Sequence, residues 1–179
     1  MTNKSFKLVM PVLALVFVIT VFGGCASSGK SYVVLDSHLV PDNRSAVVYI
    51  YDIGSSNAEI WDGETAVGTF EGVPSSRAGC IQWRTTPGAR TFIARRTNNA
   101  NLKLNLQVNR TYNLEVVYIP SPGRSRFVAL REIDQERVDS LRRRYRFEDI
   151  TYSDEWRQNF ANENNGRRLN AVREYLAGL

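Results

Sequence analysis

The stretch Gly24–Ser31 matches the phosphate-loop pattern G-x-x-x-x-G-K-[ST] letter for letter. An apolar run precedes it, and residues 46–52 imitate the apolar strand with a terminal Asp that would hold Mg²⁺. A phosphate loop must open a helix whose N-terminus faces the phosphates. The sequence that follows is Tyr32-Val33-Val34-Leu35, which is β-branched and typical of a strand. We therefore expect no nucleotide here, and we interpret residues 26–31 as a flexible tether.

Few other residues could carry out a reaction. His38 lies near Asp36 and Asp42 without a spaced Ser, Cys or second His, which is more typical of a loop residue than of a catalytic or metal site. Cys80 lies in an apolar run, which favours a buried, inert thiol over a reactive one. One His and two Cys in 179 residues exclude a Cys/His zinc site. We expect no metal, no cofactor and no enzyme activity.

Residues 1–25 have the pattern of an export signal. Lys4 and Lys7 are followed by an uncharged run, residues 8–22, which is shorter than the about 20 residues of a membrane-spanning helix. Its end, Gly23-Gly24-Cys25, resembles the lipobox of bacterial lipoproteins. That resemblance implies cleavage after Gly24, acylation of Cys25 with palmitate-type chains and, because Ala26 rather than Asp follows, sorting to the outer membrane. The alternatives are an uncleaved anchor or an ordinary secreted protein.

The charge of the chain is mildly positive. A formal charge of +5 and a pI near 9.4 are too mild to indicate nucleic acid. Loss of Lys4 and Lys7 with the signal would leave the mature chain at +3. If Cys25 carries lipid, Cys80 has no partner, so we expect no internal disulfide.

One interval of the sequence is distinctly basic. No acid occurs between Glu71 and Glu115, whereas that interval holds seven Arg and Lys residues. Such a run favours lipid phosphates or an acidic protein surface, and an ordinary solvated surface is the alternative. The candidate contacts to an anionic partner are Arg84, Arg90, Arg95, Arg96 and Lys103.

The middle of the chain predicts short strands. Asp62-Gly63 between two β-like runs predicts a hairpin. Residues 102–108 place apolar side chains at every second position, the pattern of a strand with one buried face. Asn109-Arg110 predicts a second tight turn, with residues 111–119 returning as the partner strand. Seven or eight strands at this spacing predict an antiparallel β-sandwich over residues 45–133.

Three pieces of this region form a recognisable series. They are residues 58–70 with Ile60-Trp61-Asp62-Gly63, the stretch Pro87-Gly88 followed by a strand, and the hairpin in residues 104–118. They resemble small bacterial surface domains of the PEGA type and related lipoproteins of unknown function. The resemblance implies an immunoglobulin-like or prealbumin-like sandwich in the cell envelope. It supplies no catalytic residue.

The spacing of apolar residues changes in the last fifty residues of the chain. Val138, Leu141 and Tyr145 recur at helical spacing after the capping residue Asp134, and they form a candidate docking helix. Ser153 predicts a second helix start, Asn165-Gly166 predicts its end, and a third short helix follows. Arg142–Arg144 favour a solvated helix end over a phosphate site, because residues 131–179 carry ten Arg and ten acids.

Together these patterns predict four segments. They are a signal peptide (1–24), a lipidated Cys and tether (25–44), a β-sandwich (45–133) and a C-terminal helical extension (134–179). We expect a non-enzymatic envelope lipoprotein that acts as a structural or protein-interaction module on the membrane. The alternative is a lipoprotein that binds a small ligand, a glycan or anionic lipid. An exposed Trp61 beside its turn would favour that alternative, whereas Trp83 is expected in the core.

Overall fold

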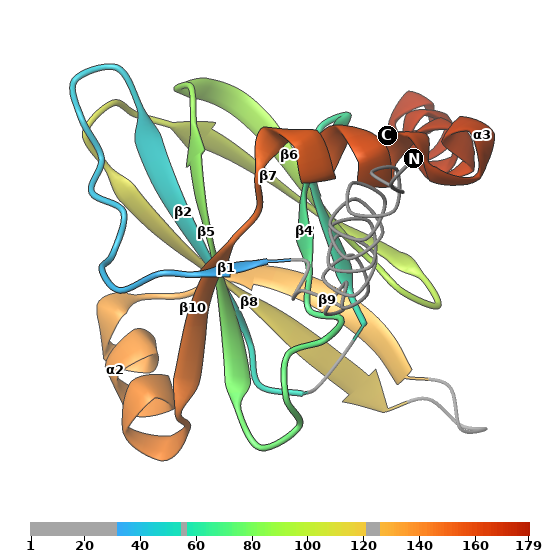
Figure 1. Ribbon diagram of the computed structural model, residues 1–179. Coiled ribbons are helices and arrows are strands. Elements are labelled where there is room, and N and C mark those ends of the chain that lie inside the picture. Colours follow the sequence, from blue (N-terminus) through green and yellow to red (C-terminus); the bar gives the residue numbers. More distant parts are fainter. Residues whose placement is uncertain (1–31, 55–56, 121–125) are drawn as a thin grey trace, which may run out of the picture. The chain divides into compact units, whose positions relative to one another are not determined.

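A computed structural model describes residues 32–54, 57–120 and 126–179 (Figure 1). Residues 31–179 form one compact unit. The predicted signal, the Gly24–Ser31 pattern and Cys25 lie outside the described residues. The described part is mainly β, with two sheets and two helices.

The larger sheet has six strands and is mixed. Its order is β1 (Val33–Val34), β10 (Phe147–Thr151), β5 (Ala78–Thr85), β2 (Ala46–Asp52), β8 (Thr111–Pro120) and β9 (Arg126–Glu132). β10 runs parallel to β5 and β2 runs parallel to β8, so the predicted all-antiparallel sandwich was wrong. Parallel neighbours need long crossovers, and here the whole second sheet is inserted in the chain between β2 and β8.

The smaller sheet is antiparallel throughout. Its order is β4 (Thr65–Thr69), β3 (Glu59–Asp62), β6 (Gly88–Arg95) and β7 (Asn99–Leu106). The predicted hairpin at Asp62-Gly63 is confirmed: β3 pairs with β4, and Gly63 has a left-handed φ of 56°. The loop itself is Gly63-Glu64, while Asp62 still belongs to the strand.

The second predicted hairpin was wrong. Asn109 has the predicted left-handed conformation, with φ of 56°. However, β7 pairs with β6 and β8 pairs with β2 and β9, so this turn carries the chain from one sheet to the other. The N–H of Asn109 donates to the carbonyls of Asp42 and Ser45, which fixes the crossing. The predicted alternation holds for residues 102–106, whereas Val108 lies beyond β7 and is exposed. The predicted partner strand was wrong.

The last part of the chain contains two helices, with β10 between them. α2 (Gln135–Arg144) begins as predicted, with Asp134 accepting a hydrogen bond from the N–H of Arg137. α3 (Asp154–Ala177) begins at the predicted cap Ser153. The predicted helix end at Asn165-Gly166 lies within α3, and both residues are left-handed, with φ of 59° and 75°. Since right-handed helix cannot accommodate two such residues, α3 changes direction there (Figure 1).

The sheet extends beyond the predicted range of 45–133 at both ends. β1 comes from the segment expected to be tether, and β10 comes from the expected helical extension. β10 lies between β1 and β5, so the C-terminal segment is part of the sheet rather than an appendage. Deleting it would expose the edge of β5.

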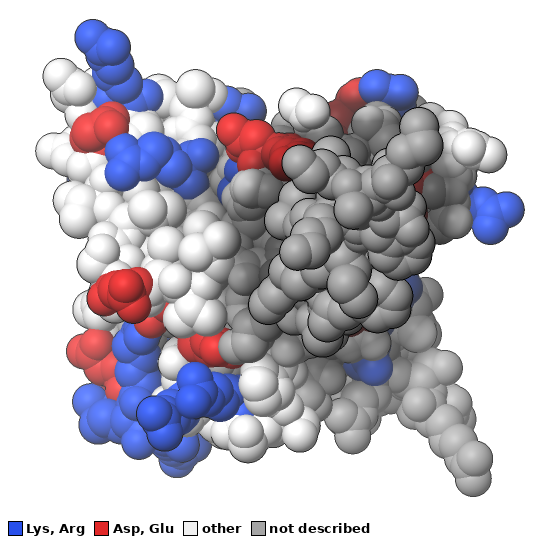
Figure 2. Space-filling view, viewed as in Figure 1, with Lys and Arg blue, Asp and Glu red and all other residues white. Residues whose placement is uncertain are grey.

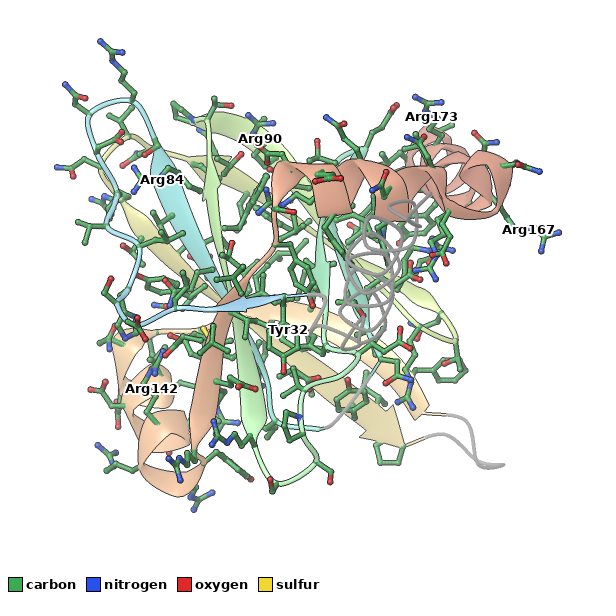
Figure 3. The ribbon with its side chains drawn as sticks, viewed as in Figure 1. Tyr32, Arg84, Arg90, Arg142, Arg167 and Arg173 are labelled. Atoms are coloured by element: carbon green, nitrogen blue, oxygen red, sulfur yellow. The ribbon has the colours of Figure 1, made fainter. Side chains whose placement is uncertain are left out.

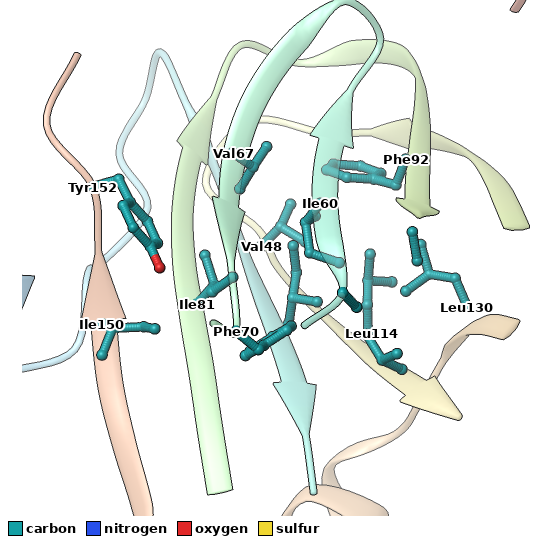
Figure 4. Packing of buried hydrophobic residues seen from close by; sticks show 14 of the residues in the cluster. Val48, Ile60, Val67, Phe70, Ile81, Phe92, Leu114, Leu130, Ile150 and Tyr152 are labelled. Carbon is teal, nitrogen blue, oxygen red and sulfur yellow. The ribbon is translucent and has the colours of Figure 1, made fainter. Parts of the chain in front are cut away.

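The core lies between the two sheets (Figure 4). Val48, Ile81 and Leu114 face it from the larger sheet, and Ile60 and Phe92 face it from the smaller one. All five are fully buried. Residues that alternate with them point outward, and the two helices cover these outer faces. The order of layers is α2, six-stranded sheet, four-stranded sheet and α3.

Candidate functional site

The outer face of the six-stranded sheet beneath α2 combines aromatic, charged and polar side chains. Tyr49 and Tyr51 alternate with the core residues of β2 and so point to this face. Val138 and Leu141 pack from α2 against Tyr51 and Cys80. Burial of these two aliphatic side chains positions α2 over the sheet.

A buried carboxylate fastens the first half of α2. Glu115 of β8 is only 2% exposed and accepts hydrogen bonds from Arg131 at 2.6 Å and from Arg137 at 2.7 Å. Burial alone would raise the pKa of Glu115, but the hydrogen bonds from Arg137 and Arg131 outweigh it and lower the pKa below its ordinary value. Glu115 is therefore ionised at neutral pH.

A second ion pair fastens the end of α2. The guanidinium of Arg142, which is labelled in Figure 3, donates to both oxygens of Asp149 in β10, at 2.8 and 3.3 Å. It also lies over the rings of Tyr51 and Phe147, at 5.5 and 5.6 Å from their centroids. Burial would raise the pKa of Asp149, yet the hydrogen bonds from Arg142 lower it. Of the three predicted helix-end arginines, Arg142 thus turns inward.

A cavity of about 430 Å³ opens beside this pair, between α2 and the loop before β2. Its size falls within the range of small-ligand sites. The ring of His38 contacts that of Tyr49 edge-on at 5.6 Å, and the Tyr49 hydroxyl donates to the carbonyl of Leu39. The residues around the cavity are His38, Tyr49, Tyr51, Thr111, Asn113, Gln135, Val138 and Arg142.

These groups favour recognition over proton transfer or nucleophilic attack. Cys80 lies beneath the cavity region, is fully buried, and has its pKa raised well above the ordinary value by that burial. Burial likewise raises the pKa of Tyr51. The carboxylate of Asp149 is held by Arg142. A ligand in the cavity would contact the edges of aromatic rings, side-chain amides and the guanidinium of Arg142, whose charge is already paired with Asp149.

The predicted anionic contacts lie in different places. Arg84 lies on β5 and is held by Asp42 at 2.6 Å, and Arg95 points to Glu59 at 3.3 Å beneath α3. Arg96 lies over the ring of Tyr118. Only Arg90 and Lys103 share a depression, of about 350 Å³, on the β6–β7 hairpin. The structure therefore brings two of these five residues together.

The candidate docking helix is largely covered by the protein itself. Val138 and Leu141 are 3% and 1% exposed, because α2 uses them to pack on the sheet. Tyr145 ends the helix and is 40% exposed. Of these three side chains, a partner could contact Tyr145.

Neither tryptophan considered as a stacking platform is freely exposed. Trp61 is fully buried against Phe160 of α3, so the exposed platform expected for the ligand alternative is absent from this position. Trp83 packs partly against the core, as predicted, and its indole N–H donates to Asp62 at 3.0 Å. Asp62 is 4% exposed and also accepts from Thr85, a role that the turn pattern did not reveal.

Sequence reasoning missed the cavity because its residues come from four separate segments. One signal was available: β2 reads AVVYIYD, so both of its faces are largely apolar or aromatic. A strand buried on both faces requires a cover on each side. No comparable pattern in the sequence indicated that Arg142 would pair with Asp149.

Among residues 32–54, 57–120 and 126–179, no three His, Cys, Asp or Glu side chains are grouped as a metal site would need. Within the same residues, neither helix is both long and apolar enough to cross a membrane. Comparison with family models, curated proteins and solved structures found no match to this chain. The resemblance to PEGA-type domains therefore stays a prediction.

Proposed function

We propose that this protein is a non-enzymatic cell-envelope lipoprotein, held at the outer membrane by lipid on Cys25, whose folded domain serves as a structural or protein-interaction module. The lipobox-like end of residues 1–25 supports the anchor. An immunoglobulin-like or prealbumin-like relationship is part of the same proposal, supported by the face-to-face packing of two sheets. Such a relationship must accommodate the two parallel strand pairs.

The observation that carries the proposal is the short span between Cys25 and the folded domain. Tyr32 is 5% exposed, and its hydroxyl donates to the carbonyl of Gly72 at 3.2 Å and to Glu148 at 3.1 Å. Seven residues from Cys25 to Tyr32 can span at most about 25 Å. Lipid on Cys25 would therefore hold the domain close to the bilayer surface, where it can contact other envelope components.

One uncovered part of the outer sheet face suits a protein contact. Ile119 and Phe127 are cross-strand partners on β8 and β9, and they are 48% and 41% exposed. They lie on the same face as Glu115 and Arg131, beyond the part that α2 covers. Adjacent exposed apolar side chains of this kind are typical of contact surfaces.

The anchor is tested by metabolic labelling with a fatty-acid analogue. We expect the wild-type chain to take up the label and to fractionate with membranes, and Cys25→Ser to lose both. Cys80→Ala is the matched control, because Cys80 is fully buried and should not affect labelling. Equal labelling of the wild type and Cys25→Ser would contradict the anchor.

The interaction is tested by placing a photoreactive residue at Phe127, at Tyr145 or at Lys103 in cells. We expect a discrete protein adduct from Phe127, and none from Tyr145 or Lys103. A chain that ends at Ile133 cannot be used to test the role of the C-terminal segment, because it would lack β10 and so disrupt the sheet. Absence of a protein adduct from all three positions would contradict the protein-interaction role.

The cavity beside α2 favours a second candidate function, the binding of a small neutral polar ligand such as a sugar. Arg142 is already paired with Asp149, so the cavity does not demand a charged ligand. Aromatic edges with amide groups around them suit a sugar ring. Titration with glucose and N-acetylglucosamine, followed by NMR, should shift signals of Asn113 and Gln135 in the wild type and not in Asn113→Ala. No shift with either sugar would contradict this function.

A further inference from the structure

Four arginines gather at the end of α2 and the adjoining loop, around an exposed tyrosine. We call Arg77, Arg143, Arg144, Tyr145 and Arg146 the basic end. Arg143, Arg144 and Arg146 are exposed, and none of them forms an ion pair with another described residue. Arg77 is 37% exposed and lies 3.7 Å from Glu148. The basic end is therefore positively charged, and few acidic side chains in the described part of the chain neutralise it.

The charges around α2 are segregated rather than mixed. Its acids, Glu136 and Asp139, lie in its first half, with the cap Asp134 before them. Its free cations follow in the last turn and just beyond it. Figure 2 shows Lys and Arg gathered at the lower left, where α2 lies in the same view of Figure 1. The helix dipole accounts for cations in the last turn, but Arg146 and Arg77 lie outside the helix.

The basic end is joined to the start of the domain by a short series of contacts. Tyr32 bonds to Glu148, and Glu148 approaches Arg77. The N–H of Ala78 donates to the carbonyl of Arg146 at 3.1 Å, which holds the loop against the end of α2. The chain thus enters the domain beside this surface, and Cys25 is no more than about 25 Å from Tyr32.

We propose that the basic end binds anionic lipid headgroups of the membrane in which the Cys25 lipid is embedded, and so fixes which side of the domain faces the bilayer. This rests on the proposed function, because the anchor supplies the proximity. Arginines within a Debye length of an anionic surface each strengthen binding roughly five-fold, and the exposed Tyr145 suits the headgroup region. The uncovered pair Ile119 and Phe127 would then stay available for a protein partner.

The test uses the mature protein isolated from the cells that make it, whose mass reports whether it is acylated. It is reconstituted into vesicles of phosphatidylcholine alone or mixed with phosphatidylglycerol. Backbone hydrogen exchange is measured at residues 71–77 and 140–147. We expect slower exchange there only when phosphatidylglycerol is present, and reversal at high salt. In Arg143→Gln/Arg144→Gln/Arg146→Gln this slowing should vanish, since three such contacts together contribute roughly 100-fold to headgroup affinity.

The matched control is Lys103→Gln/Arg110→Gln/Arg167→Gln, which removes three exposed cations elsewhere and should keep the slowing. Equal exchange in both vesicle types, with the protein floating with both, would overturn the proposal alone and would leave an acidic protein as the partner. A chain that lacks acyl mass and floats with neither vesicle would overturn the proposed function, and the inference with it.

Discussion

The two helices cover the two outer faces of the domain with different chemistry. α2 is held to the six-stranded sheet by two ion pairs, Arg137 with Glu115 and Arg142 with Asp149, and by the buried side chains of Val138 and Leu141. α3 is held to the four-stranded sheet by aromatic packing around Trp61 and by one half-buried ion pair, Arg168 with Glu59 at 2.9 Å. One attachment therefore depends mainly on ionised carboxylates, and the other depends mainly on buried apolar area.

The aromatic attachment also reaches the start of the domain. Tyr32 contacts Tyr152 edge-on at 6.2 Å, Tyr152 packs on Trp156 at 4.0 Å, and Trp156 stacks on Phe160 at 4.5 Å. Phe160 in turn contacts Trp61. Rings in such contact add stabilisation beyond the area they bury. We infer that α3 and the first residues of the domain are stabilised together, whereas α2 can respond to pH on its own.

The largest expected effect comes from removing the centre of the aromatic attachment. Trp61→Ala should lower the free energy of unfolding by about 3 to 5 kcal/mol, because the side chain is fully buried and leaves a cavity under α3. Urea denaturation followed by circular dichroism measures this. Trp61→Phe is the control and should cost less, since it keeps an aromatic ring. A loss below about 1 kcal/mol for Trp61→Ala would show that α3 is attached in another way.

The polar attachment should be weaker. Glu115→Gln should lower the free energy of unfolding by about 1 to 3 kcal/mol, because it leaves Arg131 and Arg137 facing a neutral amide. Both arginines are partly exposed, at 53% and 35%, so solvent limits the cost. The same denaturation assay applies. If Glu115→Gln cost as much as Trp61→Ala, the distinction between the two attachments would be lost.

Prediction from sequence succeeded where the signal was local. The caps at Asp134 and Ser153 and the hairpin at Asp62-Gly63 each depend on a few neighbouring residues, and all three are confirmed. Left-handed Asn109 was also right, yet its turn could connect either a hairpin or two sheets. Only the packing of β7 and β8 on opposite sheets decides between them, and alternation does not encode that partner.

β10 shows why the polar attachment was not predictable. Its sequence, FEDIT, places Glu148 and Asp149 side by side in an interior strand, which local propensity disfavours. The two carboxylates point to opposite faces, where Arg77 and Arg142 meet them. Arg77 is distant in sequence, and Arg142 belongs to α2, whose position on the sheet could not be inferred from the sequence. The candidate site was hidden for the same reason, because its lining comes from four segments that are far apart in the sequence.

Acid should weaken the α2 attachment selectively. The pKa values of Glu115 and Asp149 are lowered in the folded protein, from ordinary values of 4.5 and 3.8, so the unfolded chain binds more protons as the pH falls. Their stabilisation is complete above these ordinary values and is lost progressively below them. We expect the free energy of unfolding to fall between about pH 5 and pH 3 more steeply in the wild type than in Glu115→Gln/Asp149→Asn. Parallel curves would assign the acid sensitivity to other groups.

The smallest effect is expected from an exposed ion pair on the surface of α3, in contrast to the buried carboxylate that holds α2. Glu64 and Arg173 join the turn after β3 to α3 at 2.8 Å, but their side chains are 54% and 53% exposed. Water and salt screen such a pair, so Glu64→Gln should change the free energy of unfolding by no more than about 0.5 kcal/mol. Glu115→Gln, measured in the same buffer, removes one carboxylate charge in the same way but from a buried position. If Glu64→Gln proved equally costly, α3 would depend on its exposed ion pairs as strongly as α2 depends on its buried carboxylates, and the contrast between the two attachments would be lost.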